Sequence, residues 1–104
     1  MPLDNLIVAV CDSFFTAYSK LPKGQQAKVM NFVNKFRIDP TGGGINYETL
    51  GGVKDKNLKS VRIDKNYRGI VYKPEKGNVY LLLWVDSHDD AYRWARNRVC
   101  EVNP

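Results

Sequence analysis

The chain contains few of the residues that metal sites and covalent catalysis require. Its 104 residues include a single histidine, His88, and two cysteines, Cys11 and Cys100. The cysteines have neither the CxxC spacing nor the histidine neighbours of a zinc site, and two thiols do not make a disulfide framework. We therefore expect two ordinary thiols, no metal ion and no cofactor.

Long apolar runs are also missing. No stretch approaches the roughly 20 residues that a membrane-spanning helix needs. The apolar run at 6–10 is short and has no basic leader, so no secretory signal is expected. With 43% hydrophobic and 26% charged residues, the composition is that of a soluble globular protein, and the length suits one domain, 1–104. We expect a cytoplasmic protein that does not bind membranes.

Acidic residues are too few to balance the basic ones. The chain has 16 Lys and Arg against 11 Asp and Glu, which gives a net charge of +5. Most of the excess lies in residues 51–104, where eleven basic residues face seven acidic ones. Such a surface suits RNA, DNA or an acidic protein partner. The alternative is that these charges only keep the domain soluble.

The stretch 58–95 carries the clearest structural pattern. Alternating and β-branched residues predict three consecutive antiparallel strands, at 58–64, 67–73 and 78–86. The last contains VYLLLWV, which is typical of a strand buried on both faces and therefore inside its sheet. A helix from about 87 to 99 follows, with His88 in its first turn.

This final helix has its own start signal and inner face. Ser87, followed three residues later by Asp90, resembles a capping box. The inner face is predicted from its helical spacing, and it consists of Ala91, Tyr92, Ala95 and Val99.

The first forty residues predict a strand and two helices. Asn5 to Ala9 is the strand, and Asp12-Ser13 supplies the cap of the first helix. Pro22 is suited to the first position of a second helix, which Asp39-Pro40 ends, because a residue before proline is pushed out of the α region. The following stretch, 40–57, holds five of the eight glycines and is predicted to be an irregular connection. Three apolar residues attach it to the core: Ile45, Tyr47 and Leu50.

Several short motifs resemble the RelE/ParE superfamily of bacterial toxins. They are Arg62 at a strand end, Tyr67-Arg68 before an apolar strand, and the run from Trp84 to Tyr92. Four sequence segments more closely resemble a RelE-like domain found at the N-terminus of some UvrD/Rep-type DNA helicases: NYETL, SVRID, YRGIV and KPEKGNVYLLLWVDSHDDAYRWA. The resemblance implies an α+β fold in which an N-terminal αα-hairpin packs on a twisted antiparallel sheet with a C-terminal helix.

The same resemblance implies a function. RelE-like toxins bind RNA and cleave ribosome-bound mRNA without a metal, and an antitoxin protein restrains them. By position, Arg68 corresponds to the arginine that stabilises the phosphate, while His88 and Tyr92 correspond to the histidine or tyrosine near the chain's end. These three are the catalytic candidates of a metal-independent endoribonuclease, and the nucleic-acid-binding candidates are Lys59, Arg62 and Arg68.

Each candidate also has a purely structural interpretation. Arg68 is placed to pair with an acid such as Asp64 or Asp86, and His88 at a helix start is often simply solvated. The other candidates have similar alternatives, as a packed ring or as solvated strand charges: Tyr92, Lys59 and Arg62.

A second functional hypothesis comes from three acids near the last strand. Catalytic members of the superfamily carry basic residues there, whereas this chain has Asp86, Asp89 and Asp90, and acids repel a scissile phosphate. The alternative is therefore a non-catalytic domain that binds nucleic acid or protein and is attached to a UvrD-type DNA helicase. In that case the natural chain continues past Pro104.

Overall fold

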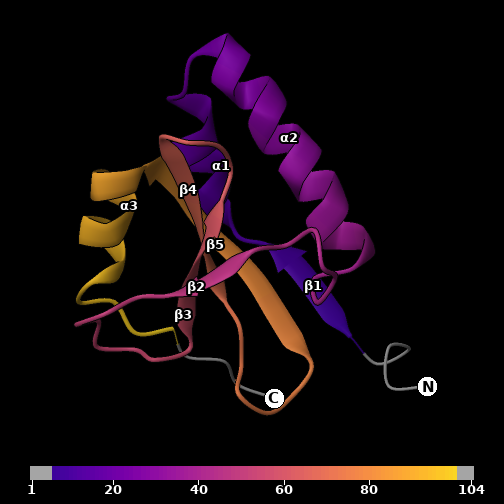
Figure 1. Cartoon of the computed structure of the whole chain (residues 1–104), viewed down its shortest axis with the longest axis vertical. Coiled ribbons are helices and arrows are strands. Elements are labelled where there is room, and N and C mark those ends of the chain that lie inside the picture. The colour runs from indigo at the N-terminus through magenta and orange to yellow at the C-terminus, as the bar shows by residue number, and fades with distance from the viewer. Residues whose placement is uncertain (1–5, 101–104) are drawn as a thin grey trace.

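A five-stranded sheet with helices on both faces forms the body of the molecule in the computed structural model, which describes residues 6–100 (Figure 1). The elements follow in the order β1 (Ile7–Val10), α1 (Asp12–Ser19), α2 (Lys23–Ile38), β2 (Tyr47–Thr49), β3 (Leu58–Arg62), β4 (Tyr67–Tyr72), β5 (Val79–Ser87) and α3 (His88–Ala95). The predicted α+β fold class is confirmed. None of the three helices within the described range is long and apolar enough to cross a membrane.

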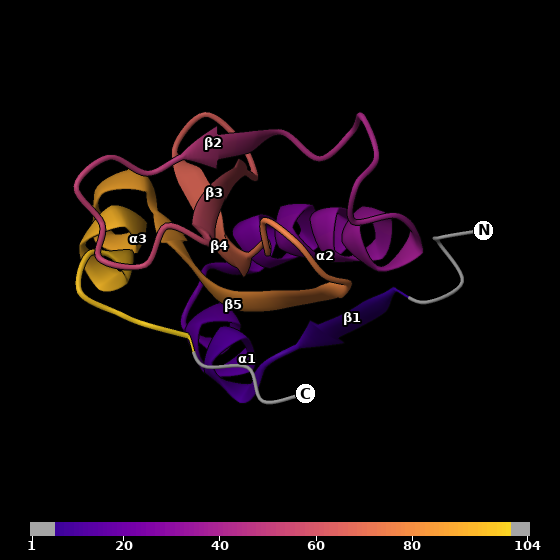
Figure 2. The same cartoon turned by 90° about the horizontal axis from the view of Figure 1, so that it is seen from below.

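The strands lie in the order β1-β5-β4-β3-β2. Neighbours from β2 to β5 are antiparallel, as predicted, whereas β1 runs parallel to β5. Figure 2 shows β1 and β2 at opposite edges of the sheet. The predicted interior position of the apolar strand β5 is confirmed. The first strand occupies Ile7–Val10 instead of the predicted 5–9, and Asn5 lies outside the described residues.

The sheet separates two hydrophobic cores. One core packs the inner sides of α1 and α2 against one face, and it includes Phe14, Phe36 and Val71. The other packs α3 and the 50–53 loop against the opposite face, and it includes Ile70 and Ala91. Ile70 and Val71 are neighbours in the chain, yet they fill different cores because successive strand residues point to opposite faces. Figure 1 accordingly shows α2 and α3 on opposite sides of β3 and β4.

The αα-hairpin forms largely as predicted. The second helix ends at Ile38 because Asp39 is extended, with φ −154° and ψ 93°, before Pro40. Four apolar residues spaced along one side of α2 are buried, as their helical periodicity indicates: Val29, Phe32, Val33 and Phe36. The predicted cap of α1 is wrong, since Cys11 is the N-cap residue and makes no side-chain cap bond. Ser13 instead donates from Oγ to the Leu83 carbonyl at 2.6 Å, which ties α1 to β5.

The stretch 40–57 is more ordered than its glycines suggested. Tyr47–Thr49 form the short edge strand β2, which pairs with β3, so the prediction of an irregular connection was wrong at these three residues. The predicted attachment is confirmed, because Ile45 and Leu50 are buried. The Tyr47 hydroxyl also donates to the Pro40 carbonyl at 2.6 Å. A strand of three residues is too short for alternation to reveal it.

The final helix is shorter than predicted. It ends at Ala95 instead of 99, and Val99, expected on the inner face, is exposed. Ala91 and Ala95 are buried as predicted. Ser87 is the N-cap residue, but its hydroxyl donates to the Asp90 carboxylate at 3.1 Å and caps no backbone amide. The resemblance to a capping box therefore predicted where the helix starts, but the hydrogen bond from a backbone amide to Ser87 that a capping box would form is not made.

Gly69 offers a test of how tightly the first core is packed. It lies in β4 opposite Val61, and a Cβ atom placed there would lie 3.0 Å from Val61 Cγ2. We expect Gly69→Ala to lower the free energy of unfolding by about 1–3 kcal/mol, because the core has no room for the extra methyl group. Urea denaturation of both proteins measures the difference.

Gly24 supplies the matched control. It lies in α2, and a Cβ atom there would meet nothing within 4 Å. Gly24→Ala should leave stability unchanged or raise it by about 0.5–1 kcal/mol, since alanine favours the helix. Equal effects of the two substitutions would show that packing at Gly69 is loose.

Candidate nucleic-acid interface

Two arginines lie opposite each other where β3 ends and β4 begins. Arg62 at the end of β3 is the register partner of Arg68 in β4. Paired residues point to the same face, and Arg68 lies two residues before Ile70, so both belong to the face that carries α3. Like charges directly opposite each other destabilise a strand pair. The chain therefore keeps two cations together at some cost in stability.

Arg68 is held by contacts within the protein. Its Nη1 donates to the backbone carbonyls of Asp64 at 2.6 Å and Tyr67 at 3.0 Å. Its Nε lies 3.7 Å from Glu48 Oε1 in β2, and the side chain is only 12% exposed. Sequence reasoning expected Asp64 or Asp86 as the partner. The acid is Glu48, which went unnoticed because β2 was not predicted.

Arg62 is the more accessible member of the pair. Its side chain is exposed and has no ion-pair partner among residues 6–100. It also borders a hollow of about 240 Å³ that Lys28, Asn31 and Lys35 of α2 help to line. Arg62 thus lies at the end of the sheet, where it borders α2 although its strand register assigns it to the face of α3.

His88 lies at the same end of the sheet as Arg68. Tyr67 and Ser87 are register partners, so His88 follows β5 beside the start of β4, and its amide donates to the Asn66 carbonyl at 2.8 Å. The ring is 57% exposed, and its Nδ1 lies 3.0 Å from Asp89 Oδ1. His88 is therefore open to solvent and beside an acid.

Tyr92, one helical turn after His88, has its hydroxyl engaged. The hydroxyl donates to the Gly51 carbonyl, and Gly52 beside it has φ +71°. The Arg96 guanidinium lies 5.6 Å from the centre of the ring. Tyr92 therefore ties the 50–53 loop to α3.

Lys59 does not join the arginine pair. It is the register partner of Val71, whose side chain lies in the core under α1 and α2. Lys59 consequently belongs to the opposite face of the sheet from Arg68. The three residues expected to bind nucleic acid thus divide between two faces.

The described residues offer little to a metal ion or to thiol chemistry. Within residues 6–100, no three side chains of His, Cys, Asp or Glu gather in a way that would hold a metal ion. Cys11 and Cys100 are both free, and burial raises the pKa of each thiol. A raised pKa keeps a thiol in its unreactive, protonated form.

Comparisons with known proteins settle the fold. No family model and no curated protein matches the chain. Among solved structures, the archaeal RelE–RelB complex from Pyrococcus horikoshii OT3 matches with a TM-score of 0.57 and 22% identity, over 79% of this chain and 93% of that one. The RelB–RelE complex from Methanococcus jannaschii gives 0.62 and 11%, over 83% and 96%. The toxin–antitoxin complex RelBE2 from Mycobacterium tuberculosis gives 0.57 and 18%, over 80% and 98%.

The chain has a RelE-like fold. This agrees with the architecture expected from the short motifs around Arg62, Tyr67-Arg68 and Trp84. The edge strand β2 and the parallel strand β1 complete the sheet in this RelE-like domain.

Three acids lie where β5 meets α3 in this RelE-like domain. The Asp86 carboxylate accepts a hydrogen bond from Trp84 Nε1 at 3.2 Å, and Asp90 lies 2.6 Å from Arg93 Nη1. Asp89 is 88% exposed beside His88. All three acids therefore have a local partner, and Asp89 is the most exposed of them despite its contact with His88.

Asp64 holds the turn that carries Arg68. Its carboxylate accepts hydrogen bonds from Gln25 and Lys28 of α2 at 2.9 and 3.0 Å. It also accepts from the amides of Asn66 and Tyr67 at 2.8 and 2.9 Å. Burial raises the pKa of this carboxyl, but the four donors outweigh burial and hold the pKa well below its usual range. One side chain thus joins the β3–β4 turn to the αα-hairpin.

Removing the Asp64 charge should give a pH-dependent loss of stability. We expect Asp64→Asn to lower the free energy of unfolding by about 1–3 kcal/mol at pH 7, because an amide cannot accept all four bonds. A lowered folded-state pKa stabilises the protein above the unfolded value of about 3.9, and this contribution is lost as pH falls below it. The difference between wild type and variant should therefore shrink below about pH 4.

Urea denaturation between pH 3 and 7 measures this difference. Asp89→Asn is the control, because a substitution at this exposed position should change stability by less than about 0.5 kcal/mol. A gap between wild type and Asp64→Asn that stays constant down to pH 3 would contradict the role assigned to the carboxylate.

Proposed function

We propose that the protein is a RelE-type toxin domain that binds RNA through the face of the sheet carrying Arg62 and Arg68. The observation that supports this most directly is the arginine pair itself. Two cations opposite each other repel, and a bound phosphate would relieve the repulsion. Arg62 is exposed and unpaired within the described residues, so it supplies the first contact.

The same proposal includes cleavage of ribosome-bound mRNA. Attack of a 2′-hydroxyl on the neighbouring phosphate needs a base, a cation for the developing charge and an acid for the leaving oxygen. His88 supplies the proton-transfer group, Arg68 supplies the cation, and Tyr92 contacts the substrate or donates the second proton. No metal takes part in this chemistry, and the site of action is the cytoplasm.

An antitoxin protein is the partner that goes with this proposal. The matched archaeal structures are complexes of RelE with RelB. In this chain, a hollow of about 290 Å³ between α1 and α2 is lined mainly by apolar side chains, and two of them, Phe15 and Met30, are exposed. Exposed apolar side chains that gather at a hollow are typical of protein-binding surfaces.

A second candidate is a non-catalytic binding domain of the kind attached to UvrD-type helicases. The guanidinium of Arg68 is bound to backbone carbonyls and to Glu48, and the hydroxyl of Tyr92 is bound to Gly51. Both groups would have to leave these partners before they could act on a substrate. This engagement favours binding without chemistry.

RNA binding is tested by the salt dependence of affinity. For a single-stranded oligoribonucleotide, we expect Arg62→Ala to reduce the slope of log K against log salt by about 0.7, because one fewer counterion is released. Fluorescence anisotropy over a range of salt concentrations measures the slope. Lys20→Ala removes a charge of the same sign from the far end of α1 and should leave the slope unchanged. Equal slopes for wild type and Arg62→Ala would remove this face as the RNA-binding surface.

Cleavage is tested separately, by expressing the chain in a bacterium. A catalytic toxin should arrest translation and cut mRNA on ribosomes, and His88→Gln should slow cutting by about 10²–10⁴-fold through loss of proton transfer. Primer extension on ribosome-bound mRNA locates and quantifies the cuts. A folded wild-type chain that binds RNA without arresting translation would favour the second candidate.

A further inference from the structure

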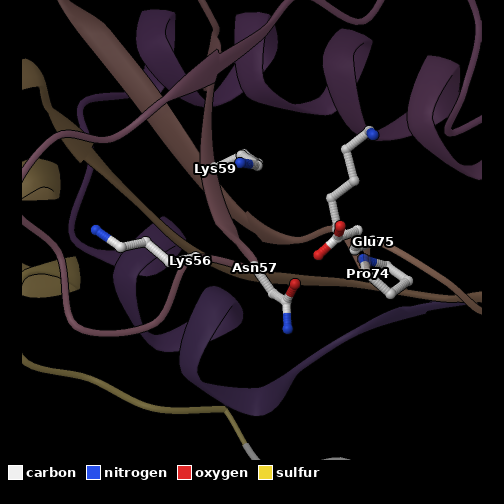
Figure 3. A pocket seen from close by; sticks show the side chains of 6 residues that line it. Lys56, Asn57, Lys59, Pro74 and Glu75 are labelled. Atoms are coloured by element: carbon white, nitrogen blue, oxygen red, sulfur yellow. The ribbon is translucent and has the colours of Figure 1, made fainter.

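A pocket rich in lysine lies on the face of the sheet opposite the arginine pair. Its volume is about 310 Å³, and six residues line it (Figure 3): Lys56, Asn57, Lys59, Lys73, Pro74 and Glu75. They come from the loop before β3, from β3 itself and from the loop after β4. The sequence analysis singled out only Lys59 among them.

Backbone pairing brings the lysines together. Lys59 is the register partner of Val71, which places it diagonally across from Lys73, two residues further along. The Lys73 amide donates to the Asn57 carbonyl at 2.8 Å, so the loop before β3 meets the end of β4. The pocket is therefore built on the hydrogen-bonded ladder of the sheet and the segment just beyond it.

The charge of the pocket is largely unbalanced. None of its three lysines has an ion-pair partner among residues 6–100. Lys73 Nζ lies 5.4 Å above the centre of the Tyr47 ring, a cation–π contact that directs the side chain without neutralising it. Glu75 is the one acid in the lining, so the pocket carries a net charge of about +2 at neutral pH.

The chemistry of the lining suits a phosphate group. Lysine ammonium groups bind phosphate as point charges, and the Asn57 side chain adds a neutral donor. Glu75 repels anions and so lowers the net attraction of the pocket for them. A phosphate group carries more negative charge than a carboxylate, so the pocket attracts phosphate more strongly. Three cations around one hollow also repel each other, and a bound anion lowers that repulsion.

We propose that this lysine pocket binds a phosphate group, and that the phosphate belongs to the same RNA that contacts Arg62. The second part rests on the proposed RNA-binding function. Lys59 and Arg62 are three residues apart on β3, which corresponds to about 10 Å along an extended strand. Because they point to opposite faces, one RNA strand reaches both by passing around the edge of the sheet at β2. The pocket is thus a second phosphate site, separate from the arginines.

The test combines two titrations of one double variant. Lys56→Gln with Lys59→Gln removes two charges from the pocket and leaves Lys73 on Tyr47. The matched control, Lys20→Gln with Lys23→Gln, removes two exposed charges, one just after α1 and one at the first residue of α2. Inorganic phosphate is titrated while the backbone amides of Asn57 and Glu75 are followed by NMR. A single-stranded oligoribonucleotide is titrated by anisotropy at several salt concentrations.

We expect phosphate to shift both amides in the wild type and the control, and to shift neither in the pocket variant. The salt slope for RNA should fall by up to about 1.4 in the pocket variant and much less in the control. If phosphate shifts neither amide in the wild type, the pocket does not bind phosphate and the proposal is overturned. If phosphate binds the wild type but the pocket variant and the control give equal salt slopes for RNA, the assignment of the phosphate to RNA is overturned. The ligand of the pocket would then be a free phosphorylated molecule. If the wild type binds no RNA but phosphate still fills the pocket, the proposed function fails and the phosphate site stands.

Discussion

Burial of the central strands on both faces is the constraint on which the arrangement of charge depends. Because β4 and β5 contribute alternate residues to two cores, their middle positions are almost wholly apolar. The cations lie at the ends of these strands, in the loops and on β3, next to the edge strand β2. Arg62 and Arg68 lie at the ends where β3 and β4 meet, and Lys73 follows the other end of β4. The fold therefore concentrates positive charge at the two ends of one strand pair.

The same constraint explains why the two basic sites lie on opposite faces. A residue and the one three places along a strand differ in face, because the side-chain period is two. Lys59 and Arg62 differ in this way, so they cannot share a flat surface however close they lie in the sequence. Asp64 then fixes the arginine end relative to α2 through four hydrogen bonds. Position and orientation of the cations thus follow from strand register and from one carboxylate.

Sequence reasoning predicted the elements with long, regular patterns. The strands β3 to β5, the stripe of α2 and the end of α2 before Pro40 all carry strong local signals. It missed β2, which has three residues, and it placed the end of α3 four residues late, since Val99 continues the helical spacing without being buried. Which face a site residue occupies was predictable from alternation, but its partner was not. The contact between Arg68 and Glu48 depends on a strand pairing that leaves no trace in either local segment.

The candidate residues Arg68 and Tyr92 are both engaged by groups within the protein. Arg68 is held by hydrogen bonds to two backbone carbonyls and by a 3.7 Å ion pair with Glu48, and Tyr92 is held by a hydrogen bond to Gly51. A bound phosphate competes directly with Glu48 for the same guanidinium, and it carries more charge than a carboxylate. The Nε of Arg68 is buried and makes no hydrogen bond within the described residues, so its present arrangement is not the best available to it. An anion that displaces Glu48 and accepts a hydrogen bond from Nε would satisfy Arg68 more fully. The contacts of this arginine therefore depend on whether a ligand is bound as well as on the fold.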